Sequence, residues 1–201
     1  MDWNDIAPSW DAKAGVRLYA ASALEAVEEL LSSHGRSLEG QRALDFGCGT
    51  GLLSELLAQN CGEVVGLDPA PNMIGAFRAK IAANAWDHVH ALLGTLDEAL
   101  ARDELSSPSF DLVVCSSVCA FVPDYPSTVR QLAELLRPGG HFVQFDWELD
   151  EASQRSFGLS REQIEGALTG AGLEAVSVTP SFCILVEGQQ MQPLMGVGRR
   201  P

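Results

Sequence analysis

The sequence has few basic residues, and they do not gather in any one stretch. Its 201 residues contain 13 Lys and Arg against 27 Asp and Glu, which gives a formal charge of −14. Nucleic acids and anionic membrane surfaces bind proteins through clustered positive charge. We therefore expect neither to be a partner of this protein, and the acidity itself favours solubility.

A membrane-spanning run and a targeting signal are also missing. The longest uncharged apolar stretch, 112–123, is too short to cross a bilayer, and the first eleven residues carry three acids with no apolar segment behind them. The five cysteines form no CxxC pair, and the four histidines lack the spacing of metal ligands. We expect a cytoplasmic protein with reduced cysteines, no bound metal and no membrane association.

Short apolar runs rich in β-branched residues alternate with helical patterns from residue 42 onward. Their order predicts an α/β fold: a doubly wound, Rossmann-like, mostly parallel sheet with helices on both faces. Strands are expected at 42–46, 63–67, 88–93, 110–115, 141–147 and 173–179, with a seventh within 191–198.

Residues 1–40 precede the first expected strand and are predicted to be an N-terminal helical lid or cap on a domain that spans residues 41–201. An amphipathic helix is expected from Val16 to Leu31. Ligands of such sheets bind at the carboxyl ends of the strands, so a helix over that edge would be a lid. A helix that completes the core fits the same pattern.

A glycine-rich loop, Gly47-Cys48-Gly49-Thr50-Gly51, joins the first expected strand to a helix. Its three glycines let the backbone approach a ligand closely, and the N-terminus of the helix favours an anionic group. Asp68 ends the second strand, where a carboxylate can accept hydrogen bonds from both hydroxyls of a ribose. The combination predicts a cofactor that contains a nucleoside.

Two residues discriminate between nucleoside cofactors. The dinucleotide fingerprint G-x-G-x-x-G would need a glycine directly after Gly51, where the sequence has Leu52, and the Asp45 carboxylate would repel a pyrophosphate. A ligand with an ammonium and a sulfonium would be attracted to Asp45. S-adenosylmethionine is such a ligand, and an NAD-dependent oxidoreductase is the alternative that these residues disfavour.

Several segments resemble the motifs of the class I S-adenosylmethionine-dependent methyltransferases: LDFGCGTG (44–51), VVGLDPAPNM (64–73), GTLDEAL (94–100), FDLVVCSSVCAFVPD (110–124) and LLRPGGHFVQFD (135–146). The resemblance implies a seven-stranded sheet with an antiparallel last strand, and S-adenosylmethionine as the cofactor. Thr95 stands where the family often has an acid. The cofactor contacts implied in this way are Asp45, Gly47, Cys48, Gly49, Gly51, Asp68, Pro69, Met73, Thr95, Leu96 and Cys115.

The methyl acceptor is expected at the ends of the fourth and fifth strands. Position alone suggests the acceptor contacts Tyr19, Phe121, Asp124, Tyr125, Trp147 and Glu148. Asp124, Tyr125 and Glu148 are candidate bases for an acceptor that must lose a proton. The segment CSSVCAF is not the Asn-Pro-Pro-aromatic motif of amino-methylating DNA and glutamine methyltransferases, which disfavours an exocyclic or amide nitrogen as the acceptor.

We therefore expect an enzyme that transfers a methyl group from S-adenosylmethionine to a small molecule and leaves S-adenosylhomocysteine. No residue is assigned a catalytic role, because methyl transfer needs mainly alignment and exclusion of water. A non-catalytic module that binds the cofactor, or a subunit that activates a partner, is the alternative. The acceptor and the oligomeric state are not specified by the sequence.

Overall fold

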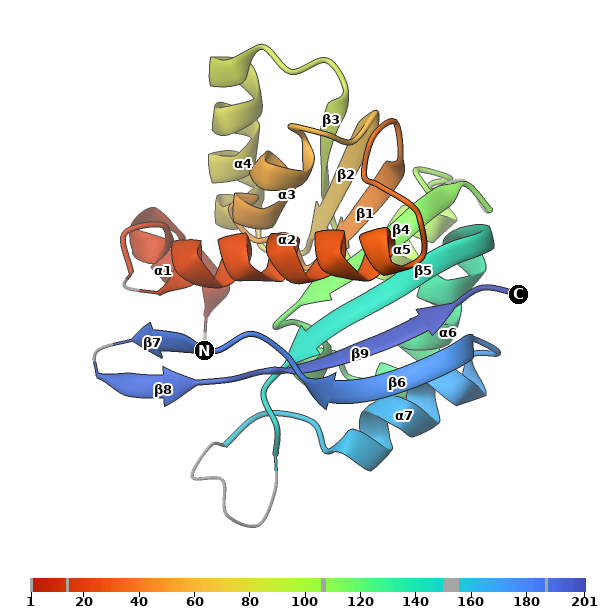
Figure 1. The fold of residues 1–201 in the computed structure, drawn as a ribbon. Coiled ribbons are helices and arrows are strands. Elements are labelled where there is room, and N and C mark those ends of the chain that lie inside the picture. The colour runs from red at the N-terminus through yellow and green to blue at the C-terminus, as the bar shows by residue number, and fades with distance from the viewer. Residues whose placement is uncertain (1, 14, 106–107, 150–155, 187) are drawn as a thin grey trace.

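The computed structural model describes residues 2–13, 15–105, 108–149, 156–186 and 188–201 (Figure 1). A seven-stranded sheet with the order β3-β2-β1-β4-β5-β9-β6 forms its centre. Neighbouring strands run parallel except β9, which is antiparallel to both β5 and β6. The predicted α/β fold with an antiparallel last strand is confirmed. The strands are β1 Arg42–Phe46, β2 Glu63–Asp68, β3 Val89–Leu93, β4 Phe110–Ser116, β5 Leu136–Asp146, β6 Glu174–Pro180 and β9 Leu194–Arg199.

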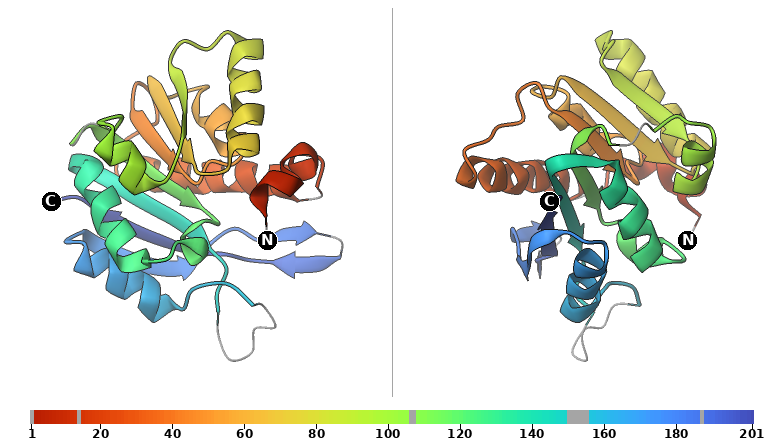
Figure 2. Two further views of the ribbon diagram at one scale, coloured as in Figure 1. Left: turned by 180° about the vertical axis from the view of Figure 1, so that it is seen from behind. Right: turned by 90° about the vertical axis from the view of Figure 1, so that its right-hand side faces the viewer.

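Helices cover both faces of the sheet (Figure 2). One layer consists of α2 (Val16–Ser33), α3 (Leu52–Leu57) and α4 (Pro71–Asn84), and the other of α5 (Leu96–Ala101), α6 (Tyr125–Leu135) and α7 (Arg161–Gly170). Successive strand residues face opposite layers, so Ala43 and Leu44 belong to different core clusters although both are fully buried. The sheet therefore has apolar cores on both faces, as its continuous apolar strands predict.

The N-terminal segment forms two helices instead of the single predicted one. The extra helix, α1 (Trp3–Trp10), begins where the Asp2 side chain accepts a hydrogen bond from the Asn4 N–H. Helix α2 packs through Val27 and Leu31, both fully buried, and so completes the core on its face of the sheet. Helix α1 instead lies at the carboxyl end of the parallel strands, beside the start of α4 (Figure 1).

The fifth strand begins earlier than predicted, because it contains a bulge. Its pairing with β4 jumps from Phe110–Leu136 to Leu112–His141, which leaves 137–140 outside the regular ladder. Gly139 has a φ of +79°, which glycine adopts without strain. The strand ends at Asp146, so Trp147 lies just beyond it rather than inside it.

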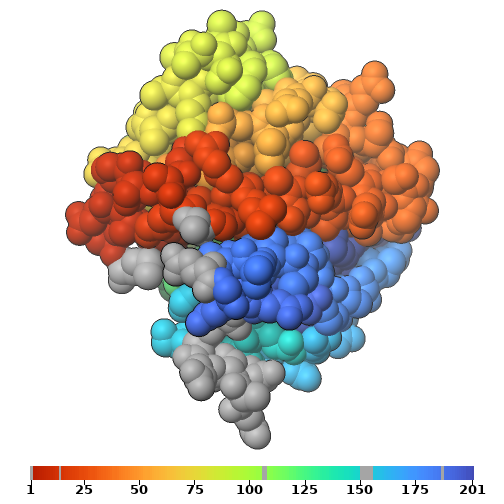
Figure 3. Space-filling model, turned by 60° about the vertical axis from the view of Figure 1, so that its left-hand side comes forward, coloured from red at the N-terminus to blue at the C-terminus, as the bar shows by residue number. Residues whose placement is uncertain are grey.

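A short hairpin that the sequence pattern did not predict precedes the last strand. Strands β7 (Ile184–Val186) and β8 (Gln189–Met191) form a separate two-stranded sheet. The hairpin adjoins the N-terminal helices, as the space-filling view shows (Figure 3). A Cβ on Gly15 would lie 2.5 Å from a methyl carbon of Val186, so the two segments are in close contact. Among the described residues, no helix combines the length and apolar character needed to cross a membrane.

Candidate cofactor site

The three glycines of the loop after β1 all have positive φ, at +72°, +55° and +81°. A Cβ on Gly47 would lie 2.3 Å from Val118, and a Cβ on Gly51 would lie 2.2 Å from the Phe77 ring. A Cβ on Gly49 would meet only the Met73 sulfur, at 3.8 Å. Gly47 and Gly51 are thus packed against the protein, whereas the outer side of Gly49 is open for a ligand.

Asp68 stands directly beside this loop at the end of β2. One carboxylate oxygen accepts a hydrogen bond from the Gly49 N–H at 3.0 Å, and the other accepts one from the Ala70 N–H at 2.8 Å. Burial raises the pKa of this carboxyl above its usual value. Each oxygen has a further lone pair, so the carboxylate can still accept hydrogen bonds from a diol.

Asp45 is a buried acid in β1 with an incomplete hydrogen-bond set. Its Oδ2 accepts a 2.6 Å hydrogen bond from the Ser54 hydroxyl, whereas its Oδ1 has no hydrogen-bond partner. Burial, and secondarily the negative charge of Asp68, raises the pKa of Asp45 to about 6. A buried carboxylate oxygen without a donor is costly, so a cationic ligand group beside it would be stabilised.

The remaining predicted cofactor residues lie around this loop and at the start of α5. Cys48 and Met73 are buried, and Pro69 is exposed. The Thr95 hydroxyl caps α5 by accepting a hydrogen bond from the Glu98 N–H, so it is already engaged, and Leu96 follows in the first turn. Cys115 is fully buried in β4, next to Phe46 of β1.

A hollow lies between α1 and the turn that follows Asp68. It has a volume of about 480 Å³ and is lined by Trp3, Asn4, Pro69 and their neighbours. Asn72 donates two 3.1 Å hydrogen bonds to Asn4, one from its backbone N–H and one from its side-chain amide, and these bonds attach α1 to α4. Helix α1 therefore forms one wall of the space beside the predicted ribose acid.

Three of the candidate acceptor residues, Tyr19, Trp147 and Phe121, belong to two groups of aromatic rings. The segment that follows β4 connects the two groups. The Ser117 hydroxyl donates a 2.9 Å hydrogen bond to the Tyr19 hydroxyl, and the Tyr19 ring packs against Trp147. Four residues further along, Phe121 packs edge-on against Trp3 of α1. The two groups therefore flank the carboxyl end of β4.

Three other acceptor candidates are already engaged within the protein. Asp124 caps α6 by accepting a hydrogen bond from the Ser127 N–H. The buried Tyr125 donates its hydroxyl hydrogen to Gln144 at 2.7 Å, and Glu148 makes a two-pronged ion pair with Arg161 at 2.6 and 3.0 Å. Each side chain thus has a structural contact at the position where the sequence suggested an acceptor contact.

A buried acid at the end of β5, Asp146, was not among the predicted site residues. Its carboxylate accepts hydrogen bonds from the Ala120 N–H at 3.3 Å and from the Gln144 side chain at 3.1 Å. Burial raises the pKa of Asp146 to about 7. Gln144 and Asp146, two polar residues on the same face of a buried strand end, are the signal that could have revealed it.

Asp11 was also not predicted, and it connects the N-terminal segment to the glycine loop. Its carboxylate accepts a hydrogen bond from the Thr50 hydroxyl at 2.5 Å and pairs with the Lys80 ammonium at 2.7 Å. Lys80 in turn pairs with Glu55 of α3 at 2.8 Å. These contacts lower the pKa of Asp11, against the opposing effect of its burial. Spacing along the chain gives no hint of a contact between residues 39 positions apart.

Comparisons with known proteins identify a methyltransferase domain in this chain. A family model described as a methyltransferase domain matches residues 44–142, from the glycine loop to β5. The ubiquinone biosynthesis O-methyltransferase of Marinobacter nauticus is 38% identical over 107 residues, which cover 52% of this chain and 43% of that protein. The malonyl-[acyl-carrier protein] O-methyltransferase of Serratia marcescens is 30% identical over 161 residues, covering 80% of this chain and 59% of that protein. The chain belongs to the class I S-adenosylmethionine-dependent methyltransferase family.

Solved structures share the methyltransferase fold. A Thermotoga maritima protein described as an S-adenosylmethionine-dependent methyltransferase, possibly acting on histamine, aligns with a TM-score of 0.71 over 99% of this chain and 98% of its own, at 18% identity. The magnesium protoporphyrin IX methyltransferase of Synechocystis with bound S-adenosylmethionine aligns with a TM-score of 0.67 over 92% of this chain and 82% of its own, at 21% identity. The chain spans about half the length of the curated relatives it matches.

Proposed function

We propose that this protein binds S-adenosylmethionine and transfers its methyl group to a small molecule, leaving S-adenosylhomocysteine. The observation that carries the proposal is the position of Asp68 beside Gly49. The Asp68 carboxylate accepts a hydrogen bond from the Gly49 N–H, and one side of Gly49 is not packed against the protein. The partnerless Oδ1 of Asp45 provides a second match, because it would receive the ammonium of the cofactor. The residues present therefore fit this cofactor.

Each part of the site has a role in this proposal. The loop 47–51 holds the amino acid portion of the cofactor, Asp68 accepts hydrogen bonds from the ribose hydroxyls, and Pro69 and Met73 flank the adenosine. Because the Thr95 hydroxyl already caps α5, the backbone N–H of Leu96 is the better donor to the adenine. Cys48 and Cys115 contribute packing beneath the cofactor, since both are buried.

When bound, S-adenosylmethionine supplies a methyl group on a positively charged sulfur, which is reactive enough to need little chemical assistance. The chain would align the acceptor with this methyl and keep water away. The segment that follows β4 and the rings of Tyr19, Trp147 and Phe121 are positioned to do so. No side chain is assigned as a general base.

The N-terminal helix α1 is, in this proposal, a lid over the cofactor. Its contacts support this role, because Asn4 is bonded to Asn72 of α4 and Asp11 is bonded to Thr50 of the glycine loop. The proposal also includes a cytoplasmic location, where thiols stay reduced. In its support, all five cysteines are unpaired.

Calorimetry with S-adenosylhomocysteine tests the binding step. Asp68→Ala is expected to weaken binding by about 1–3 kcal/mol, because the ribose hydroxyls lose their charged acceptor. Asp87→Ala, at a fully exposed side chain, is the matched control and should bind like the wild type. Absence of binding to the wild type at millimolar ligand, or an unchanged affinity of Asp68→Ala, would overturn this cofactor assignment.

A turnover assay separates an enzyme from a binding module. Incubation with S-adenosylmethionine and pooled small metabolites should release S-adenosylhomocysteine, whereas a module that only binds would release none. Titration with NADH should give no saturable fluorescence change, in contrast to the expectation for an NAD-dependent oxidoreductase.

A further inference from the structure

We infer that the methyl acceptor is an amine that carries a positive charge in solution and is attached to an aromatic or other apolar body. The inference rests on the proposed function and adds the class of substrate. It is carried by the charges and the ring systems that surround the carboxyl ends of β1, β2, β4 and β5.

Three buried carboxyl groups lie at these strand ends: Asp45, Asp68 and Asp146. Their hydrogen-bond donors are neutral groups: the Ser54 hydroxyl for Asp45, backbone N–H groups for Asp68, and the Ala120 N–H, the Gln144 amide and the Cys119 thiol for Asp146. Within the described ranges, none of the three forms an ion pair with a basic side chain. Burial raises the pKa of Asp45 to about 6 and that of Asp146 to about 7, so above pH 7 these groups carry a negative charge that is left for ligands to balance.

Asp45 and Asp146 lie on opposite sides of β4, and each raises the pKa of the Cys115 thiol between them, although burial is the main cause. The predicted cofactor contacts are concentrated on the β1 and β2 side. Asp146 is on the β5 side, where the acceptor is expected. Asp45 thus supplies a negative group to the cofactor half of the site, and Asp146 supplies one to the acceptor half.

The basic side chains near this edge are already occupied. Lys80 and Arg17 both pair with Asp11, and Arg161 pairs with Glu148. Lys13 stacks over the ring of Trp10, and Arg102 pairs with Glu104. A carboxylate or phosphate on the acceptor would therefore have to displace an existing partner and enter a negative field.

The charge balance of the reaction points the same way. An ammonium acceptor first releases one proton to the solvent. The lone pair of the resulting amine then forms the N–C bond. At the same time the S–C bond breaks and leaves its electron pair on sulfur. Positive charge passes from sulfur to nitrogen and is conserved, so fixed carboxylates stabilise it throughout the transfer. With an anionic oxygen acceptor the two charges would cancel, and the carboxylates would repel the acceptor.

The aromatic groups described above suit the uncharged part of such a molecule. Phe121 is 40% exposed and packs against Trp3 and Phe157, while Tyr19 packs against Trp147 and Phe182. Ring faces attract cations and also cover apolar skeletons. The acid-lined strand ends and the two ring groups together match an arylalkylamine.

The test compares acceptors that share a skeleton and differ in charge. Phenethylamine and tryptamine are assayed against the alcohols 2-phenylethanol and tryptophol and against the acids 3-phenylpropionate and indole-3-propionate, with mass spectrometry of S-adenosylhomocysteine and of the methylated product. We expect the amines to be turned over at least about tenfold faster than either other class. Raising the ionic strength from about 20 to about 300 mM should lower kcat/KM for the amines severalfold, because screening weakens charge attraction.

Asp146→Asn removes the buried charge and keeps an oxygen that can accept the Ala120 hydrogen bond. It should lower kcat/KM for the amines about fivefold more than for the alcohols, whereas Asp87→Asn should change neither. Faster turnover of an alcohol or an acid, or no turnover of the amines, overturns the inference. Calorimetric binding of S-adenosylhomocysteine in the same preparation shows that the proposed function survives such a result, and its absence shows that the function has failed too.

Discussion

Gly47, Gly49 and Gly51 share a left-handed backbone but differ in what surrounds them. A side chain at Gly47 or Gly51 would overlap Val118 or Phe77, whereas a Cβ at Gly49 would make only an ordinary contact with the Met73 sulfur. Two of the glycines therefore matter for packing of the loop, and the middle one matters for a ligand. Substitution by alanine should separate these two requirements.

Gly49→Ala is expected to fold, with a loss of stability of about 1 kcal/mol from the left-handed backbone. Its affinity for S-adenosylhomocysteine should fall at least about tenfold, because the methyl group occupies space beside Asp68. Gly51→Ala should instead lower the melting temperature strongly, since it overlaps a buried ring. Thermal denaturation and calorimetry on both variants measure the contrast, and a Gly49→Ala protein that binds normally would contradict it.

The pKa of Asp45, raised by burial to about 6, leads to a second prediction. A cationic ligand group needs the ionised carboxylate, so binding below pH 6 must first release a proton. Affinity for S-adenosylhomocysteine should rise between pH 5 and pH 7, by up to about tenfold per pH unit below the pKa, and then level off. Calorimetry across this range measures the profile.

Asp45→Asn is the matched variant for this profile. It should bind more weakly at pH 7 and lose most of the dependence on pH, because no carboxyl remains to titrate at that position. A flat profile in the wild type would show that Asp45 does not contact the charged end of the ligand.

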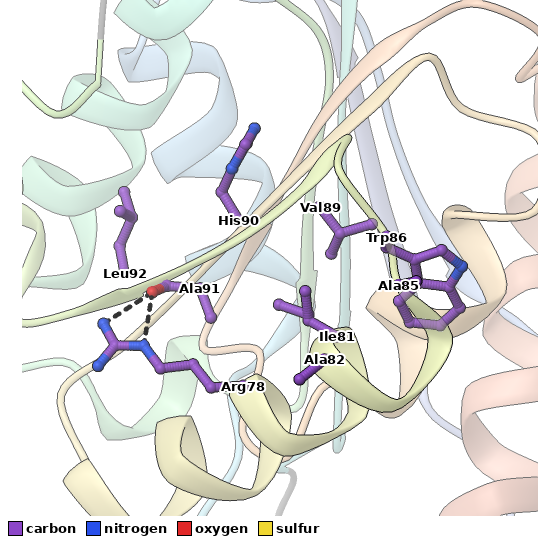
Figure 4. A pocket seen from close by; sticks show the side chains of 9 residues that line it. All are labelled: Arg78, Ile81, Ala82, Ala85, Trp86, Val89, His90, Ala91 and Leu92. Carbon is purple, nitrogen blue, oxygen red and sulfur yellow. Dashed lines mark hydrogen bonds between the residues drawn. The ribbon is translucent and has the colours of Figure 1, made fainter.

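At the scale of elements, β3 forms an open edge of the sheet, and two arginines cover its outward carbonyls. The Arg78 guanidinium donates two hydrogen bonds to the Ala91 carbonyl, as Figure 4 shows, and Arg102 donates one to the Leu93 carbonyl. The carbonyls of the alternate residues face β2, as the bond from the Val64 N–H to the His88 carbonyl shows. Beside this edge lies an apolar hollow of about 430 Å³ between α4 and β3.

An edge strand with free carbonyls can pair with another chain, and charged side chains normally prevent this. The double variant Arg78→Ala, Arg102→Ala should therefore self-associate at concentrations where the wild type does not, which sedimentation velocity would detect. Arg130→Ala together with Arg17→Ala removes the same charge elsewhere and is the control. Equal association of the two double variants would indicate a general effect of charge rather than edge pairing.

Strong local signals made most elements predictable. The capping box of Ser160 and Gln163 forms at α7 as its sequence indicates. The glycines at 47, 49 and 51 likewise made the turn between β1 and α3 predictable. Helix α1 has apolar residues at helical spacing (Trp3, Ile6, Ala7 and Trp10), but it is only eight residues long and contains Pro8, so the pattern was easy to miss. The two strands of the hairpin β7–β8 have three residues each, too few for a repeating pattern.

The site was predictable where its residues follow strand ends, and not where its contacts join distant segments. Asp68 could be expected beside the loop, because β1 and β2 are neighbours in a parallel sheet. The bonds of Asp11 to Thr50 and of Tyr125 to Gln144 depend on how α1 and α6 dock, which no local spacing encodes. Asp146 belongs to the first kind, because it ends β5, although its hydrogen bond from the Ala120 N–H depends on how the segment after β4 folds.

At the scale of the whole molecule, the buried acids oppose the stability of the free protein near neutral pH. Burial raises the pKa of Asp146 to about 7, far above the value of an unfolded chain, so the folded state holds a proton that the unfolded state has already lost. Between about pH 4 and pH 7 the stability should therefore fall as the pH rises, by up to about 1.4 kcal/mol per pH unit for this group.

We accordingly expect a melting temperature several degrees lower at pH 7.5 than at pH 5.5. Asp146→Asn should reduce the dependence on pH, and S-adenosylmethionine should restore stability at the higher pH by binding to the folded state. Differential scanning calorimetry at both pH values measures each effect. Stability that rises over this interval in the wild type would contradict the assigned burial of charge.

Strand β9 has a consequence for the order in which the chain can assemble. It follows every other described element in the sequence, yet it sits between β5 and β6 and is the only strand through which β6 joins the sheet. During synthesis, the strands around the glycine loop have their strand partners before β9 leaves the ribosome, whereas β6 has no strand partner until then. A growing chain can thus pair β3, β2, β1, β4 and β5 first. Strands β9 and β6, which form the far edge of the sheet, can join it only afterwards.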